Sequence, residues 1–214
     1  MKDQIQSLAS LSGPFPPFDL DAACDGPCDL FSVWLREAIE AGVKEPHAMV
    51  LSTVDDSGAP DARVLILKNL DHRGWHFATT DAGPKGQQIA ANPYVALTFY
   101  WQPLGRQVRI RGIALRAPEA ERGRDFRRRS AAARAVALVG RQSEILASRR
   151  ELDLAVETQA RRIVETPDIA APNWSLFMVM PHQVEFWQGN PDRLHQRLRY
   201  RKAKSGWLRE PLWP

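Results

Sequence analysis

The feature that most constrains the fold is a succession of short runs rich in β-branched and aliphatic residues, each bounded by turn signals. Between the first two runs lies Asp55-Asp56-Ser57-Gly58, a sequence that favours a tight turn. Many short strands with helices inserted between them predict a mainly β protein, a β-barrel with peripheral helices. The predicted strands are Ala48 to Val54, Ala62 to Leu67, Trp75 to Thr79, Tyr94 to Trp101, Gln107 to Leu115, Leu176 to Met180, Gln183 to Trp187, Leu198 to Arg201 and Trp207 to Arg209.

Helical periodicity occurs before and between these strands. Asp29 is the predicted N-cap of a first helix that ends near Gly42. The other predicted helices run from about Lys85 to Ala91, from Pro118 towards Ser130, and from roughly Ser148 to Val164. Residues 1–27, rich in Pro, Gly and Asp, are predicted as an extended or mobile leader, and residues 28–214 as a single domain.

Composition excludes several classes of protein. The 214 residues, 44% of them hydrophobic, suffice for one globular core, and no apolar run approaches the ~20 residues that span a bilayer. Because Met1 to Ser12 lacks the features of a secretory signal, we expect a cytoplasmic protein with no membrane partner. Cys24 and Cys28 alone do not complete a zinc site, and the five His are scattered, so no metal is expected.

The net charge of +4 is concentrated in two clusters, which lie within 122–129 and 193–204. Such clusters could bind nucleic acid, but no helix-turn-helix or zinc-finger spacing accompanies them. A small phosphorylated ligand explains the same charges, and no nucleic-acid partner is expected. The chain also lacks the Gly-rich phosphate loops of the common ATP- and NAD-binding folds.

The densest chemical signal lies near the C-terminus, where Val184 to Gly189 is followed by Arg193-Leu194-His195-Gln196-Arg197. An aromatic wall beside guanidinium groups suits a pocket for a flat, anionic ligand. The alternative is an edge hairpin whose aromatic side chain packs inward and whose Arg residues are solvated. This segment alone leaves both interpretations open.

Four further segments carry polar groups that suit a phosphate or a heterocycle. Arg63 and Lys68 end one predicted strand and face opposite sides unless a bulge intervenes. The loop Thr79 to Gly86 brings Lys85 to a helix start, which is either an anion site or an ordinary capped helix. The amides in Arg106-Gln107 and Arg141-Gln142-Ser143 both donate and accept hydrogen bonds, as the edge of a heterocycle requires.

Together these segments resemble the pyridoxine/pyridoxamine 5′-phosphate oxidase family of FMN-dependent split-barrel proteins, from about Phe31 to Pro214. The resemblance implies an FMN-binding split β-barrel and a homodimer with FMN at its interface. The motifs that carry the resemblance are Ala48 to Val54, Arg63 to Lys68, Gly105 to Val108, Arg141 to Ser143, Glu185 to Gly189 and Arg193 to Arg197.

The resemblance also implies roles for individual residues. Arg193 and His195 would cover the substrate ring as catalytic residues, and Lys68 and Arg129 would complete the substrate site. Hydride would pass to the flavin, and O2 would reoxidise it to give hydrogen peroxide and pyridoxal 5′-phosphate. The implied FMN-binding residues are Arg63, Lys68, Thr79, Lys85, Gln107, Gln142, Ser143, Trp187 and Arg197.

Several positions depart from the family pattern. Gly83-Pro84-Lys85 stands where Ser-Arg-Lys is usual, and Trp174-Ser175-Leu176 replaces Trp-Gly-Gly. In the substrate-phosphate clamp, Asp125 and Ala133 occupy the positions of a Tyr and a Ser around Arg129. Losing two donors would weaken phosphate binding, since charge-assisted hydrogen bonds contribute ~1.5–3 kcal/mol each, and Asp125 would repel a phosphate.

These departures define two alternatives to a vitamin B6 oxidase. The first is an FMN-dependent oxidase of a non-phosphorylated heterocycle such as a reduced phenazine precursor, because phenazine-biosynthesis oxidases share Lys85-Gly86, Tyr100-Trp101 and Arg141 to Ser143. The second is a flavin- or B6-phosphate-binding protein with little turnover. Pro84 favours this second alternative, and the Arg193/His195 pair disfavours it.

Overall fold

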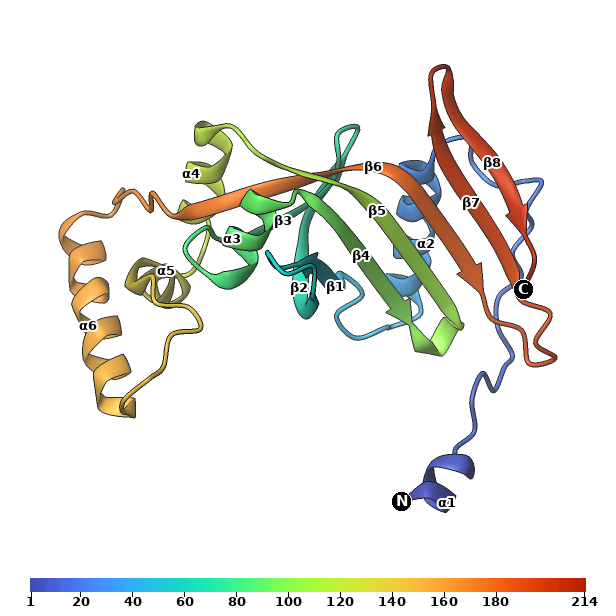
Figure 1. The fold of residues 1–214 in the computed structure, drawn as a ribbon, viewed down its shortest axis with the longest axis horizontal. Helices are drawn as coiled ribbons and strands as arrows, with labels where there is room; N and C mark the ends of the chain where they lie inside the picture. The colour runs from blue at the N-terminus through green and yellow to red at the C-terminus, as the bar shows by residue number, and fades with distance from the viewer.

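Eight antiparallel strands form one continuous sheet in the computed structural model, which describes residues 1–214 (Figure 1). The strand order is β3-β2-β1-β4-β5-β6-β7-β8, and β3 also pairs with β6. This extra pairing closes six strands into a barrel, so the predicted mainly β barrel with peripheral helices is confirmed. The strands are β1 (Ala48–Val54), β2 (Pro60–Asp71), β3 (Gly74–Thr80), β4 (Tyr94–Trp101), β5 (Arg106–Arg116), β6 (Trp174–Gln188), β7 (Gln196–Ala203) and β8 (Gly206–Leu212).

One long strand, β6, serves two parts of the sheet. Its first half pairs with β3, and its second half, from Gln183, pairs with β7. The prediction of two separate strands here was wrong. Pro181 lacks an N–H for the ladder, but it lies opposite Gly112 where the register of β5 and β6 shifts and His182 is the extra residue of β6, a position at which sheets tolerate proline. A Cβ on Gly112 would come within 2.4 Å of the Met180 carbonyl oxygen, so only glycine permits this close approach.

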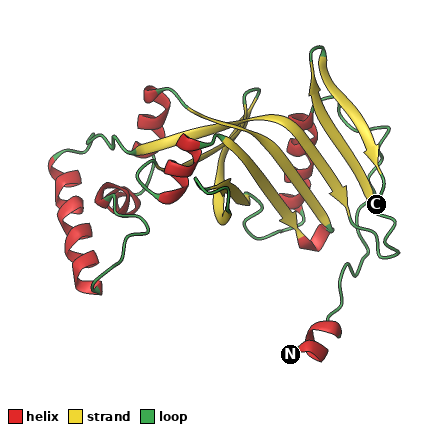
Figure 2. Ribbon diagram, viewed as in Figure 1, coloured by secondary structure: helices red, strands yellow, loops and turns green.

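Six α-helices and one short 3₁₀ turn (Gln102–Leu104) connect and flank the strands (Figure 2). The first long helix begins earlier than predicted, because Pro27 occupies its first turn and Gly26, not Asp29, is the N-cap. An unpredicted helix follows Ser130, whose Oγ accepts the Ala133 N–H. No helix combines the length and apolarity that crossing a bilayer requires. The helices are α1 (Lys2–Gln6), α2 (Pro27–Glu40), α3 (Pro84–Ala91), α4 (Glu119–Arg127), α5 (Ala131–Val139) and α6 (Arg149–Glu165).

The main core lies between the barrel and α2. Phe31 of α2 packs edge-on against Trp75 and Phe99 at ring-centroid distances of 5.4 and 4.8 Å. Trp34, one turn further along, meets Phe186 of β6 at 5.1 Å. Burying each aromatic side chain contributes roughly 2–3 kcal/mol. Helix α2 therefore holds β3, β4 and β6 in place through these contacts.

The second half of the leader also contacts this core. Phe18 is 5% exposed and packs against Trp34, and the Tyr200 hydroxyl donates to the Cys24 carbonyl oxygen. By contrast, α1 lies away from the barrel in Figure 2. From Phe18 onward, therefore, the leader contributes to the packing of the domain.

Candidate active site

A cavity of about 460 Å³ lies between β2, β3 and α5. Five of the predicted site residues line it: Lys68, Thr79, Lys85, Arg129 and Gln142. Apolar side chains from β2 and α5 form its walls, and Trp174, at the start of β6, completes them. The cavity therefore combines apolar walls with cationic and amide groups, as a site for a heterocyclic anion requires.

A bulge places Lys68 in this cavity. The pairing of β2 with β3 shifts register between Leu67 and Asn69, and Lys68 is the residue at the irregularity. Arg63 does not line the cavity; it donates to Thr53 Oγ1 at 2.6 Å and forms an ion pair with Asp61. The two cations at the ends of β2 thus have different surroundings.

Lys85 is the most buried cation of the cavity. It lies in the first turn of α3, is 8% exposed, and its Nζ donates to Gln142 Oε1 at 2.6 Å. Its pKa is below the ordinary lysine value because of burial and, secondly, because of the nearby Arg63. No carboxylate forms an ion pair with it, so an anionic ligand would stabilise its charge.

The loop between α5 and α6 is tied down by Arg141. Its guanidinium bonds Glu144 at 2.7 Å and Glu151 at 2.5 Å, which holds Gln142 against Lys85. Ser143 has a left-handed φ of 68° and is exposed, and it does not line the cavity. Of the two predicted FMN-binding residues in this loop, Gln142 lines the cavity of its own chain and Ser143 does not.

A second group of predicted residues forms a row across three strands. Gln107 of β5 pairs with Trp187 of β6, which pairs with Arg197 of β7. Paired residues project from the same face of a sheet, and the adjacent row, Val108, Phe186 and Leu198, is buried in the core. The row therefore lies on the outer face of the barrel.

Salt bridges hold this row in place. Arg197 donates to Glu185 at 3.0 and 2.8 Å and to the Trp213 carbonyl oxygen at 2.9 Å. Arg106, which the sequence grouped with Gln107, instead points inward, pairs with Glu37 and lies 4.3 Å from the Trp34 ring centroid. Its role is to attach α2 to the sheet.

The predicted catalytic pair follows this row in the chain. The ring of His195 lies 4.8 Å from that of Trp187, and its Nδ1 accepts the Asn190 N–H at 3.1 Å. The His195 pKa is below 6.5 because of burial and, secondly, because of Arg193 and Arg197. Arg193, with a left-handed φ of 65°, reaches Ser10 of the leader at 3.1 Å. At neutral pH the imidazole is therefore uncharged beside two guanidinium groups.

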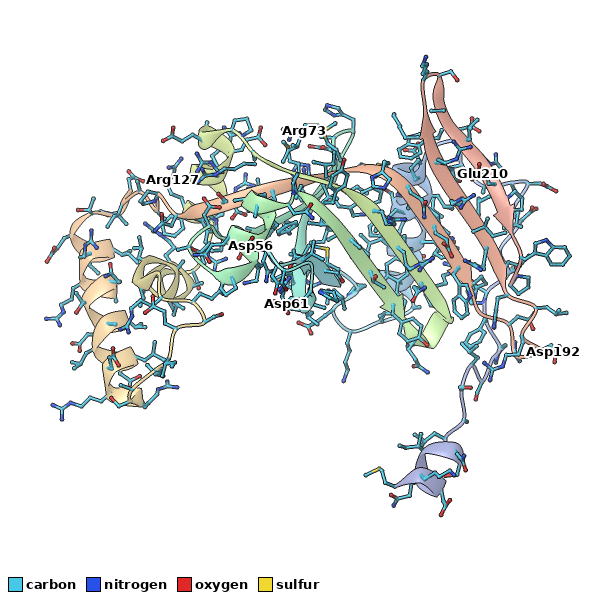
Figure 3. All side chains as sticks on the ribbon, viewed as in Figure 1. Asp56, Asp61, Arg73, Arg127, Asp192 and Glu210 are labelled. Atoms are coloured by element: carbon cyan, nitrogen blue, oxygen red, sulfur yellow. The ribbon has the colours of Figure 1, made fainter.

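One chain keeps these two groups of residues apart. Thr79 pairs with Ser175, and Gln107 pairs with Trp187, twelve positions further along β6. Twelve residues of extended chain span roughly 40 Å. Figure 1 shows β6 running from the α4–α5–α6 end of the molecule to the β7–β8 end. Figure 3 likewise separates Asp61, the partner of Arg63, from Asp192, the neighbour of Arg193.

Sequence reasoning missed part of the cavity wall. Val136, Ala137 and Val139 come from the unpredicted helix α5, and Ala-rich Ala131–Val139 after a capping Ser130 was the available signal. Asp125 does not line the cavity: its Oδ2 accepts the Trp174 Nε1–H at 2.8 Å. Asp125 therefore binds a residue of the cavity wall, and its repulsion of a substrate phosphate stays a prediction.

Comparison with known proteins identifies the family. Residues 35–161 match the family described as pyridoxamine 5′-phosphate oxidase, and residues 174–214 match the pyridoxine 5′-phosphate oxidase C-terminal dimerisation region. The chain belongs to the pyridoxamine 5′-phosphate oxidase family. This places it among flavin-dependent oxidoreductases, and the matched dimerisation region contains β6, β7 and β8.

Two curated members of the family show how far the similarity extends. A pyridoxine/pyridoxamine 5′-phosphate oxidase of Salinibacter ruber is 41% identical over 98% of this chain and 100% of its own length. A protein of the same name from Rubrobacter xylanophilus is 43% identical over 91% of this chain and 89% of its own.

Solved structures share the fold of this family member. A crystal structure of PhzG from Burkholderia lata 383, in complex with tetrahydrophenazine-1-carboxylic acid, has a TM-score of 0.88 and 28% identity, covering 94% of this chain and all of that one. A pyridoxamine 5′-phosphate oxidase-related, FMN-binding protein from Nostoc punctiforme has a TM-score of 0.67 at 20% identity, covering 86% and 97%. The second likeness supports the fold alone.

Proposed function

We propose that this protein is an FMN-dependent oxidase that converts pyridoxine or pyridoxamine 5′-phosphate to pyridoxal 5′-phosphate, with O2 reduced to hydrogen peroxide. One observation carries the proposal beyond family membership. Three cations that form no ion pair, Lys68, Lys85 and Arg129, line one cavity. Two phosphorylated ligands, flavin and substrate, would supply the anions that these side chains lack.

The donor set fits FMN. Lys85 would hold its phosphate, and Lys68, Thr79 and Gln142 would contact other polar atoms. Arg63 does not line the cavity, but its charge lowers the Lys85 pKa, so it lies near enough to Lys85 to contribute to phosphate binding. A Cβ on Gly83 would lie 2.6 Å from Gln142 Oε1, so glycine at this position leaves room for the Gln142 amide beside Lys85. When bound, FMN supplies hydride acceptance and transfers the electrons to O2. The alcohol of pyridoxine 5′-phosphate loses two hydrogens, which appear in hydrogen peroxide. The amine of pyridoxamine 5′-phosphate loses two hydrogens in the same way, and water then hydrolyses the resulting imine to the aldehyde and ammonia.

A homodimer would complete the site. Gln107, Trp187 and Arg197 lie on the outer face of one chain, far from that chain's own cavity, and belong to the matched dimerisation region or its neighbour β5. We propose that these three residues, together with Ser143 of the same chain, meet the cavity of the partner subunit and enclose the flavin there. This arrangement gives two equivalent sites per dimer.

Arg193 and His195 would hold the substrate ring against the flavin. Because His195 Nδ1 accepts the Asn190 N–H, the ring proton of the neutral form lies on Nε2. The Nε2–H and the Arg193 guanidinium are then donors for substrate oxygen atoms. We also propose a cytoplasmic location, where the thiols Cys24 and Cys28, which are free in the structure, stay reduced.

The test is FMN titration of the apoprotein followed by aerobic turnover. We expect one FMN per chain and equal yields of hydrogen peroxide and pyridoxal 5′-phosphate from pyridoxine 5′-phosphate. Unphosphorylated pyridoxine, which offers no anion to the cavity, should react far more slowly. FMN binding without peroxide formation would instead support the binding-protein alternative.

One observation favours a second candidate, the oxidation of a non-phosphorylated heterocyclic acid. Of the phosphate clamp, only Arg129 lines the cavity, and a single guanidinium matches a planar carboxylate. The PhzG structure at 28% identity holds a tetrahydrophenazine carboxylic acid. Faster turnover of such a reduced acid than of pyridoxine 5′-phosphate would establish this candidate.

The burial of Lys85 leads to a prediction about its replacement. We expect Lys85→Met to raise the melting temperature of the apoprotein and to weaken FMN binding by about tenfold or more. The folded state lowers the Lys85 pKa, so its charge opposes folding below that pKa, and the cost disappears as pH rises. Thermal melts and flavin-fluorescence titrations at pH 7 to 9.5 measure both effects. Exposed Lys44→Met is the control, and weaker FMN binding without stabilisation would contradict this account of the charge.

A further inference from the structure

Asp125, Trp174 and Arg129 form a connected set at one wall of the cavity. The Asp125 carboxylate accepts the indole N–H of Trp174 at 2.8 Å, and the Arg129 guanidinium lies 4.1 Å from the Trp174 ring centroid. Asp125 comes from α4, Arg129 from the turn between α4 and α5, and Trp174 from the first position of β6. Trp174 therefore contacts the guanidinium directly, and Asp125 contacts it only through Trp174.

The Trp174 ring has little freedom. It is 8% exposed, its residue pairs with Thr80 across β3 and β6, and Phe126 packs against it at 6.2 Å. The indole N–H is the ring's single donor, and Asp125 accepts it. Removing that acceptor would leave a buried N–H without a partner, so the ring would be expected to rotate or to shift.

The Arg129 guanidinium has hydrogen-bond donors without a close partner. Its Nε is buried and has no hydrogen-bond partner, and Nη2 makes only a long contact of 3.5 Å with the Ala133 carbonyl oxygen. Burial lowers its pKa, whereas Asp125 acts in the opposite direction, so the guanidinium is incompletely stabilised within this chain. An anion in the cavity would supply the missing partner.

We propose that Asp125 and Trp174 are positioning residues that present Arg129 to the anionic group of the substrate. The Trp174 ring supports the guanidinium through a cation–π contact, and Asp125 fixes the ring. Asp125 thus favours anion binding indirectly, although it carries a negative charge. This inference rests on the proposed function, since it assigns Arg129 a substrate anion.

Steady-state kinetics of the FMN-loaded enzyme with pyridoxine 5′-phosphate tests the proposal. We expect Asp125→Ala and Trp174→Phe each to raise KM about tenfold, with kcat changed less than about twofold. Asp125→Asn keeps an acceptor for the indole N–H and should stay within about threefold of wild type. The double variant should be no worse than either single one, because both remove the same hydrogen bond. Asp153→Ala, an exposed carboxylate of α6, is the matched control.

The outcomes separate this proposal from the proposed function. The KM for unphosphorylated pyridoxine should be the same in Asp125→Ala as in wild type. A general loss of structure would instead raise the KM for both substrates. A lower KM for the phosphorylated substrate in Asp125→Ala would make Asp125 a repelling group and overturn the inference. Additive effects, or Asp125→Asn as poor as Asp125→Ala, would overturn it as well. Wild-type enzyme that neither oxidises pyridoxine 5′-phosphate nor binds pyridoxal 5′-phosphate would overturn the proposed function itself.

Discussion

At a limiting FMN concentration, at which the Lys85→Ala and Arg197→Ala homodimers bind little flavin and are nearly inactive, a heterodimer of one chain of each is expected to regain about half of wild-type activity. Lys85 lies in the cavity, and Arg197 lies in the outer row. If each site combines the cavity of one chain with the row of its partner, both substitutions fall in one site of the heterodimer. The other site is intact. Co-expression with two different tags, followed by purification through both, gives the sample for the assay.

A second heterodimer is the control for this complementation. Lys85→Ala paired with Lys68→Ala places one cavity defect in each of the two sites, so no activity should return. Recovery in the first pair and not in the second would require sites shared between chains. If both groups of residues acted within one chain, neither heterodimer would recover, and the composite site would be ruled out.

The second large effect is expected at the Arg193/His195 loop. Arg193→Ala should lower kcat/KM for pyridoxine 5′-phosphate by about 100-fold or more, because it removes a charged donor to the substrate. FMN affinity should change less than about threefold, since the proposed flavin contacts are elsewhere. Leu194→Ala, at a neighbouring residue that is 69% exposed, tests whether disturbing the loop alone has the same effect.

The pH profile adds an independent readout for the same loop. The His195 pKa lies below 6.5 because of burial and the nearby Arg193 and Arg197. If neutral His195 is the active form, kcat/KM falls only as pH drops below that pKa. Arg193→Gln removes one repelling cation and should therefore raise the His195 pKa. The fall of the residual kcat/KM on the acid side should then begin at a higher pH than in wild type. An acid limb that does not move would exclude His195 as the titrating group.

The fold was largely predictable because its signals are local. Turn residues such as Asp55 to Gly58 and alternating apolar residues mark the strands wherever one face is buried. Pro181 misled the prediction, because its place in β6 depends on Gly112 of another strand, which no local pattern reveals. Helix α5 was missed although its signal is local, a capping Ser130 followed by an Ala-rich run.

Part of the cavity lining was predictable from the sequence, and the roles of the predicted site residues stay predictions. Lys68, Thr79, Lys85, Arg129 and Gln142 do line one cavity, and the bulge that brings Lys68 there was foreseen as a possibility. What Asp125 contacts could not be predicted, since its bond to Trp174 joins residues 49 positions apart. The sequence gives the residue type at each position, but the direction of a side chain depends on neighbours that are distant in the chain.

The most direct test of the central claim is anaerobic mixing of the FMN-loaded protein with pyridoxine 5′-phosphate, followed through the flavin absorbance. We expect rapid bleaching that depends on Arg193, recovery of the yellow colour on admitting air, and one pyridoxal 5′-phosphate per flavin bleached. A flavin that remains oxidised at saturating pyridoxine 5′-phosphate and pyridoxamine 5′-phosphate would contradict the claim.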